Sequence, residues 1–211
     1  VLIDDDSVLN WHVVEQDIKD WQDDDGSITR KDLVSVNARL LLNKTNINGT
    51  TPSIIEPRIE VANKFWSIVK NIPDLGEEGA KMKTVAAQPI ILKAIAKLTY
   101  DFAFGKNSNN EELEQLFSNV SSIDFEHNNP MWRYYQLTDD EKSEFGLLSL
   151  SEYLPNDDEG HNRDLGHYDN VSKTMRFGSK HNDILPILGD MIRWKLGLSK
   201  RKIASKKNIN S

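Results

Sequence analysis

The segment 84–104 constrains this chain most, because its apolar residues fall at the spacing of one helix face. Ile91, Ile95, Leu98 and Phe102 recur every three or four positions, which is the period of an amphipathic helix. Pro89 should either kink that helix or mark its true start, since proline is poorly tolerated inside a helix. We expect this segment to form the centre of the core.

Other stretches repeat the pattern, and none alternates apolar with polar residues as a half-buried strand would. The expected helices cover residues 9–21, 32–42, 52–69, 111–120 and 183–198. Residues 151–178 are rich in Asn, Asp, Gly and His and are expected to form a long loop. The sequence therefore predicts a mainly α fold, an irregular multi-helix domain with few or no strands. Its predicted core contains Phe65, Trp66, Ile91, Ile95, Leu98, Phe102, Leu188 and Ile192.

Two threonines stand at positions typical of a helix N-cap. Thr51 precedes Pro52, which is typical of an N-cap followed by a proline in the first turn. Pro57 comes early enough that it need not break the helix expected there. Thr138 is followed by three acidic residues, the pattern of a cap with negative charge in the first turn.

Charge is distributed unevenly and suggests three parts. Residues 1–25 contain nine acids and one base, whereas residues 193–211 contain seven bases and no acid. We predict an acidic helical N-terminal segment over 1–50, a helical core over 51–198 and a basic C-terminal tail over 199–211. Because the whole chain has a net charge of -7, nucleic acid would have to bind at the basic end.

Several function classes are disfavoured by what the sequence lacks. There is no cysteine, and therefore no disulfide framework, thiolate zinc site or cysteine nucleophile. No apolar run approaches the roughly 18 residues of a membrane span, and no signal peptide is recognisable. We expect a cytoplasmic protein without a membrane partner. The chain begins at Val1 rather than Met, as a fragment of a longer protein would.

One segment resembles a calcium-binding loop. Within residues 21–32, positions 3, 5, 6, 8 and 12 of an EF-hand loop would be Asp23, Asp25, Gly26, Ile28 and Asp32. Position 1 would be Trp21, which cannot ligate, and position 12 is Asp where Glu is usual. The alternative is an acidic turn between two helices, closed by Gly26. We predict that this loop does not bind calcium tightly.

Two histidine-containing segments carry side chains of the kinds used in metal binding or catalysis. His161, Asp164, His167 and Asp169 could ligate a transition metal, but their spacing matches no strong zinc pattern. A metal-dependent hydrolase using residues 161–169 is the weaker hypothesis beside an ordinary polar loop. The triplet His127-Asn128-Asn129 is similar to a nuclease His and Asn pair, yet a turn before Pro130 explains it equally. No complete catalytic motif is present, so neither an enzyme nor a cofactor is predicted.

The last fifty residues favour nucleic-acid binding. Residues 160–211 contain eleven basic and four acidic residues, a net charge of +7, with Tyr168, Phe177 and Trp194 interleaved. Phosphate neutralisation needs such a cluster on one face. The predicted phosphate-contacting residues are Lys173, Arg176, Lys180, Arg193, Lys200, Arg201 and Lys202.

Three stretches together resemble the DndB family of DNA-sulfur-modification-associated proteins, also called the DGQHR-domain family. The first covers residues 35–48 and continues to Phe65-Trp66; the second joins 123–125 to 128–132; the third runs from 170–173 into 188–198. The resemblance covers most of the chain and corresponds to the C-terminal half of that family. The Asp-Gly-Gln-His-Arg motif that names the family is absent, as is the N-terminal region that carries it.

The resemblance implies an accessory protein of a bacterial phosphorothioation or phage-defence locus. Some members of the family are DNA-binding regulators of the modification genes. DNA and other modification or defence proteins are then the expected partners. The competing hypothesis is a helical protein–protein module that docks modification enzymes, a role that the acidic N-terminal segment would suit.

Overall fold

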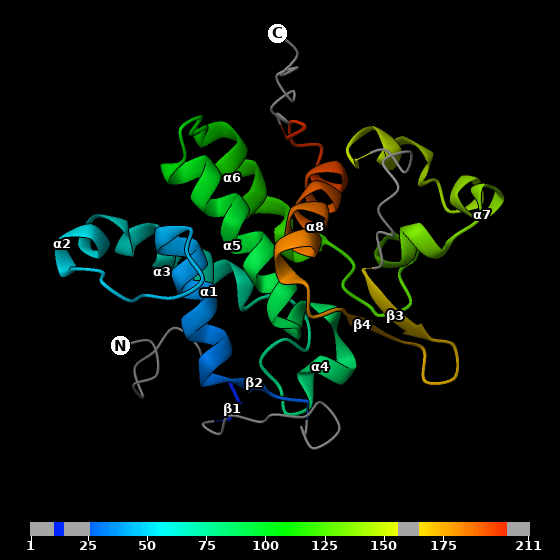
Figure 1. Ribbon diagram of the computed structural model, residues 1–211, viewed down its shortest axis with the longest axis horizontal. Coiled ribbons are helices and arrows are strands. Elements are labelled where there is room, and N and C mark those ends of the chain that lie inside the picture. Colours follow the sequence, from blue (N-terminus) through cyan, green and yellow to red (C-terminus); the bar gives the residue numbers. More distant parts are fainter. Residues whose placement is uncertain (1–10, 15–25, 156–164, 202–211) are drawn as a thin grey trace, which may run out of the picture.

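The chain folds into a body of helices with two short two-stranded sheets at its margins (Figure 1). The computed structural model describes residues 11–14, 26–155 and 165–201. The α-helices of this part are α1 (Arg30–Leu42), α2 (Pro52–Ile55), α3 (Ile59–Val69), α4 (Ala80–Lys83), α5 (Pro89–Phe104), α6 (Asn110–Asn119), α7 (Asp139–Glu144) and α8 (His181–Leu196). The 3-10 helices are η1 (Glu56–Arg58), η2 (Val85–Ala87), η3 (Val120–Ser122), η4 (Pro130–Gln136) and η5 (Leu148–Glu152). The strands are β1 (Val13–Val14), β2 (Ile28–Thr29), β3 (Gly166–Asp169) and β4 (Thr174–Phe177). The predicted mainly α fold is confirmed.

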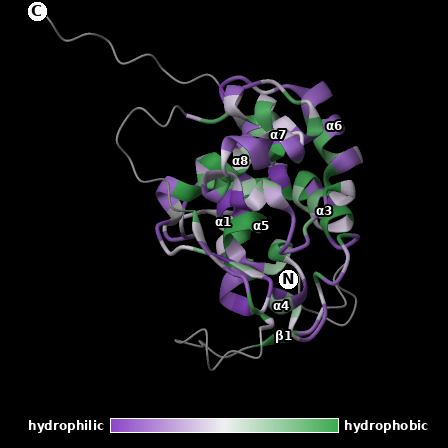
Figure 2. Ribbon diagram, turned by 90° about the vertical axis from the view of Figure 1, so that its right-hand side faces the viewer, coloured by the Kyte–Doolittle hydropathy of each residue, from purple (hydrophilic) through white to green (hydrophobic). Residues whose placement is uncertain are grey.

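Helix α5 lies at the centre of the body, where α1, α6 and α8 pack against it (Figure 1). All eight predicted core residues are buried: Phe65, Trp66, Ile91, Ile95, Leu98, Phe102, Leu188 and Ile192. The surrounding helices carry both hydrophobic and hydrophilic segments (Figure 2), as expected for helices that bury only one face. Helical periodicity therefore identified the core correctly.

One hydrophobic cluster contains residues from Ile28 to Leu198. It includes Leu33, Val36 and Leu40 of α1 together with residues of the larger body. The division of the chain at residues 50 and 198 stays a prediction.

Helix α1 begins directly after β2, and a reciprocal cap closes its N-terminus. The Thr29 hydroxyl accepts a hydrogen bond from the Asp32 backbone N–H, and the Asp32 carboxylate accepts one from the Thr29 N–H, both at 3.1 Å. Such a capping box satisfies two backbone donors at a helix start. The Asp32 carboxylate also lies 3.5 Å from the ammonium of Lys81.

The helix predicted over residues 9–21 is wrong where the structure describes it. Val13–Val14 form β1, which pairs in parallel with β2, Val13 opposite Ile28. Two adjacent β-branched residues favour extended backbone, and here a partner strand is available. Residues 9, 10 and 15–21 of the predicted helix lie outside the described part of the chain.

Prolines set the bounds of three helices. Pro52 follows Thr51 at the start of α2, as predicted, although the Thr51 side chain makes no capping hydrogen bond. The single helix predicted over 52–69 is wrong, because Pro57 lies in η1 and the α-helical path resumes only at Ile59. Proline lacks the backbone N–H that a continuous helix requires. Pro89 marks the true start of α5 rather than a kink.

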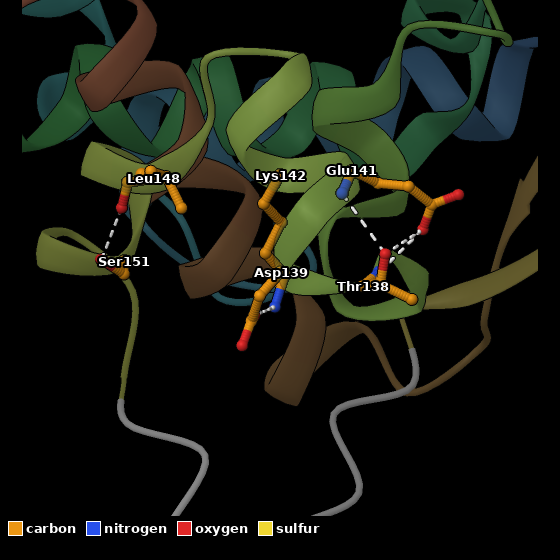
Figure 3. Close-up of polar contacts among 6 residues, drawn as sticks. All are labelled: Thr138, Asp139, Glu141, Lys142, Leu148 and Ser151. Carbon is orange, nitrogen blue, oxygen red and sulfur yellow. Dashed lines mark hydrogen bonds and ion pairs between the residues drawn. The ribbon is translucent and has the colours of Figure 1, made fainter.

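Helix α7 shows the predicted cap at Thr138 (Figure 3). The Thr138 hydroxyl accepts a hydrogen bond from the Glu141 N–H at 3.3 Å, and the Glu141 carboxylate accepts one from the Thr138 N–H at 2.8 Å. The backbone N–H and the hydroxyl of Thr138, which both donate to the Glu141 carboxylate, hold the pKa of Glu141 below its ordinary value. Lys142 adds an ion pair with Asp139 at 3.2 Å (Figure 3).

Candidate nucleic-acid interface

A β-hairpin occupies part of the segment that was expected to be a loop. Strands β3 and β4 are antiparallel, with His167 opposite Arg176 and Asp169 opposite Thr174. The hairpin projects away from the helical body, and residues 170–173 form its tip (Figure 1). The long loop predicted over 151–178 is therefore wrong for these residues. Thr174–Phe177 alternates polar with apolar residues but only over four positions, the shortest length that indicates a strand, and Gly166–Asp169 does not alternate.

The hairpin tip is fixed by its own polar groups. The Asp169 carboxylate accepts hydrogen bonds from the Val171 N–H and the Ser172 hydroxyl, each at 2.8 Å. These two hydrogen bonds, and most of all the one from the Val171 N–H, hold the pKa of the Asp169 carboxyl below its ordinary value. Lys173 adopts a left-handed backbone with φ of 58°. The turn is thus ordered without help from the side chains of Asn170 or Val171.

Along the edge of β4 that faces away from β3, side chains from distant segments bind backbone groups that a third strand would otherwise bind. The Gln88 carboxamide donates to the Met175 carbonyl at 2.7 Å and accepts from the Phe177 N–H at 3.0 Å. The Met175 N–H donates to Nδ1 of His127 at 3.0 Å. Gln88 and His127 are both buried. This edge of the sheet is therefore satisfied by side chains, which anchors the hairpin to the body.

The two faces of the hairpin differ in chemistry. Tyr168 and Met175 are buried against the body, and the guanidinium of Arg133 lies 4.3 Å from the centroid of the Tyr168 ring. His167 and Arg176 are exposed on the outer side. Gly166 begins β3 with φ of 148°, and a Cβ there would collide with the carbonyl oxygen of Arg176. The base of the hairpin accordingly requires glycine.

Three of the seven predicted phosphate-contacting residues lie on one stretch of chain that runs from the hairpin tip to the start of α8. Lys173 is at the hairpin tip, Arg176 is on β4, and Lys180 precedes α8. All three are exposed. Lys173 and Arg176 belong to the projecting hairpin, and Lys180 lies where the chain passes from β4 into α8.

Arg193 and Arg201 lie elsewhere and bind other groups of the protein, Arg193 in the interior and Arg201 at the surface. Arg193 is only 6% exposed, donates to the Ser199 carbonyl at 2.9 Å and lies 4.8 Å from the Phe102 ring centroid. Burial lowers the pKa of Arg193. The Arg201 guanidinium donates to both carboxylate oxygens of Asp190, which is 1% exposed. Burial raises the pKa of Asp190.

Of the remaining two predicted cations, only Lys200 lies among the described residues. The Lys200 ammonium is paired with the Glu152 carboxylate at 2.7 Å and lies 5.3 Å from the Tyr153 ring centroid. Lys202 lies outside the described residues.

The residues of the calcium and transition-metal hypotheses either have structural roles or lie outside the described residues. Asp32 caps α1, while Asp23 and Asp25 lie outside the described residues. His161 and Asp164 also lie outside them, and Asp169 holds the hairpin turn. Within the described ranges, no group of three or more His, Asp or Glu residues is arranged to hold a metal ion.

The His127-Asn128-Asn129 triplet forms a turn before Pro130, which was the alternative to a nuclease-like His and Asn pair. The Asn129 side chain accepts a hydrogen bond from the Met131 N–H at 3.0 Å and so caps η4. His127 anchors β4, and its burial lowers the pKa of the imidazole. Sequence reasoning missed the anchoring role of His127 and of Gln88, and it missed Asn170 and Val171 at the tip.

A comparison with protein families matches residues 13–162 to the DndB model, described as DNA-sulfur modification-associated. Two of the three stretches on which the resemblance rests fall inside this range, and the third lies beyond it. No curated protein and no solved structure gives a significant match. Among the helices that the structure describes, none is long and apolar enough to cross a membrane.

Proposed function

The chain belongs to the DndB family of DNA-sulfur-modification-associated proteins, and from this premise we propose that it is an accessory protein that binds duplex DNA through the β3–β4 hairpin. In this role it acts at a bacterial DNA-modification or phage-defence locus, as a regulator of the modification genes. The proposed contacts to phosphate are Lys173, Arg176 and Lys180.

The projecting hairpin with its three exposed cations carries this proposal. The major groove of B-form DNA is about 12 Å wide and admits a two-stranded β-ribbon, and β-ribbons are used as DNA readers in several protein classes. The hairpin lies beyond the residues matched to the family model. The proposed site therefore rests on geometry and charge, while the family supplies the association with DNA modification.

Net charge restricts where DNA can approach. The chain carries -7 overall, so most of its surface repels a polyanion. Arg193 and Arg201 are left out of the proposed surface because they are engaged with Ser199 and Asp190. Lys200 and Lys202 remain secondary proposals at the basic end of the chain.

The test is a fluorescence-anisotropy titration of duplex DNA at several salt concentrations. One variant carries Lys173→Gln, Arg176→Gln and Lys180→Gln. The matched control carries Lys44→Gln, Lys70→Gln and Lys106→Gln, exposed lysines that follow α1, α3 and α5. Both variants change the net charge equally, so a general charge effect would affect them alike.

We expect the hairpin variant to bind DNA more weakly at low salt, whatever the DNA sequence. The slope of log affinity against log salt should flatten by up to about 3, since each lost phosphate contact removes roughly 0.9 from it. The control should keep at least the wild-type slope. Equal losses in the two variants would place the DNA surface elsewhere, and no binding by the wild type would favour the protein-docking alternative.

A further inference from the structure

The most exposed large hydrophobic side chain among the described residues is at the hairpin tip. Val171 is 93% exposed, against 54% for Leu148. Single exposed apolar residues are common on protein surfaces, but this one is held in place. Its backbone N–H is bound to Asp169, and the next residue's hydroxyl is bound to the same carboxylate. The tip thus presents a methyl-bearing side chain that packs against little of the protein itself.

The neighbours of Val171 carry complementary chemistry. Asn170 is exposed, and its side-chain amide has one acceptor and two donors. In the major groove an asparagine can bind N6 and N7 of adenine, and an apolar side chain can contact the methyl group of thymine. Lys173 brings a cation to the same turn. An amide and a pair of methyl groups side by side match the two features that an A·T pair displays.

The length of the hairpin suits this approach. Four residues per strand at about 3.4 Å each give an element about 14 Å long, and the major groove is about 8.5 Å deep. With the tip at the floor of the groove, Arg176, three residues from Lys173 on β4, would be about 10 Å above it and so near the phosphate walls. The minor groove, about 6 Å wide, is too narrow for two strands and their side chains.

We propose that the tip reads A·T base pairs in the major groove, Asn170 binding an adenine edge and Val171 contacting a thymine methyl group. This inference rests on the proposed function, because it needs the hairpin to meet DNA. It adds base recognition to contacts that otherwise only position the duplex.

The test uses duplexes in which single chemical groups are removed. An A·T-rich duplex is prepared with thymidine or with deoxyuridine, which lacks the 5-methyl group, and a third version carries 7-deazaadenine, which lacks N7. Their affinities for the full chain are measured by anisotropy at low salt. The variants are Val171→Ala and Asn170→Ala, and the matched control is Val34→Ala, which trims an exposed valine on α1.

We expect the wild type to bind the thymidine duplex about fourfold more tightly than the deoxyuridine duplex, the factor for burying one methyl group. Val171→Ala, which withdraws the two Cγ methyl groups, should reduce that preference and leave affinity for the deoxyuridine duplex unchanged, whereas Val34→Ala should retain the full preference. Asn170→Ala should abolish the loss caused by 7-deazaadenine.

Two outcomes would overturn the inference, and they differ in meaning. If the wild type binds all three duplexes equally while the three-cation hairpin variant still loses affinity, the hairpin binds DNA but its tip does not read bases. If no duplex is bound at low salt, the proposed function fails as well. Both tip residues are exposed, so the variants should fold; thermal melting curves that match the wild type would verify this.

Discussion

The Gln88 side chain donates a hydrogen bond to the carbonyl of Met175 at 2.7 Å, across 87 positions of sequence. The same carboxamide accepts from Phe177, so one residue before α5 holds two positions of β4. The hairpin is consequently an extension of the core and not a detached loop. A substitution that removes this anchor should therefore lower both the stability of the protein and its affinity for DNA at the proposed surface.

Replacing Gln88 with alanine should destabilise the protein substantially. Two buried backbone groups of β4 would lose their partners, and each buried unsatisfied group costs about 1–3 kcal/mol. We expect the free energy of unfolding from urea titration to fall by about 2–4 kcal/mol. Gln136→Ala is the matched control, because the exposed Gln136 carboxamide also donates to the hairpin, at the Gly166 carbonyl. Its cost should stay below about 1 kcal/mol, and equal costs would contradict the anchoring role of Gln88.

The body of this fold was predictable from sequence because its cause is local. The spacing of Ile91, Ile95, Leu98 and Phe102 places them on one face whatever surrounds α5, and all four are buried. Thr138 likewise caps α7 as expected, since capping depends on neighbouring residues only. The hairpin was not predictable in this way. Its strands are four residues long, and its edge is satisfied by Gln88 and His127 from far along the chain.

The candidate site was predicted only in part, because the exposure of each cation also depends on contacts between distant parts of the chain. Counting charge identifies a basic end of the chain but does not tell which cations face solvent. Arg193 and Arg201 count equally with Lys173 in the sequence, yet both are engaged with groups of α8 and of the chain that follows it. Asn170 and Val171 attract no attention in a charge count, and only the hairpin geometry places them at a tip.

Protonation of His127 should weaken the hairpin anchor. Burial lowers the pKa of this imidazole, so the native state resists a proton that the unfolded chain takes up near the ordinary pKa of about 6.5. The stabilisation is therefore complete above that pH and is lost as the pH falls through it toward the lower native pKa. We expect the free energy of unfolding of the wild type to drop between about pH 7.5 and pH 5.

The matched variant for this prediction is His127→Asn. An asparagine oxygen takes the place of Nδ1 and can accept the Met175 N–H, but it does not titrate. The difference between the wild-type and variant unfolding free energies should shrink as the pH falls. Parallel pH profiles for the two proteins would show that His127 is not responsible for the acid sensitivity.

The buried Asp190 should depend on Arg201. Removing the guanidinium by Arg201→Ala leaves a carboxylate that is 1% exposed with only the nearby charge of Arg193 as compensation. Breaking a buried pair on one side costs about 3–5 kcal/mol; because the Arg201 side chain is 38% exposed, we expect roughly 1–3 kcal/mol here. Adding Asp190→Asn should restore part of the loss, because no unpaired charge then remains. If the double variant is as unstable as the sum of the two single ones, measured by urea unfolding, the pair is not coupled.

Asp169 links the order of the hairpin tip to its charge, and two substitutions separate these roles. Its carboxylate remains ionised at neutral pH, since the Val171 N–H and the Ser172 hydroxyl lower its pKa. It therefore repels the phosphates that the hairpin is proposed to meet, while it fixes the turn that presents Asn170 and Val171. Asp169→Asn removes the charge but keeps an oxygen that can accept the Val171 N–H. Asp169→Ala removes the same charge and also the acceptor.

Both variants should therefore bind DNA more tightly than the wild type at low salt, by roughly two- to fivefold, and this gain should vanish at high salt where charges are screened. Only Asp169→Asn should keep the preference for thymidine over deoxyuridine, because only it retains the ordered turn. Glu60→Gln on α3 changes the net charge equally at an exposed site away from the hairpin, and it should alter neither affinity nor preference. Anisotropy titrations at two salt concentrations measure all of these quantities. If Asp169→Ala keeps the wild-type preference, base reading does not depend on the ordered tip, and the geometry on which the tip proposal rests is not the one used in solution.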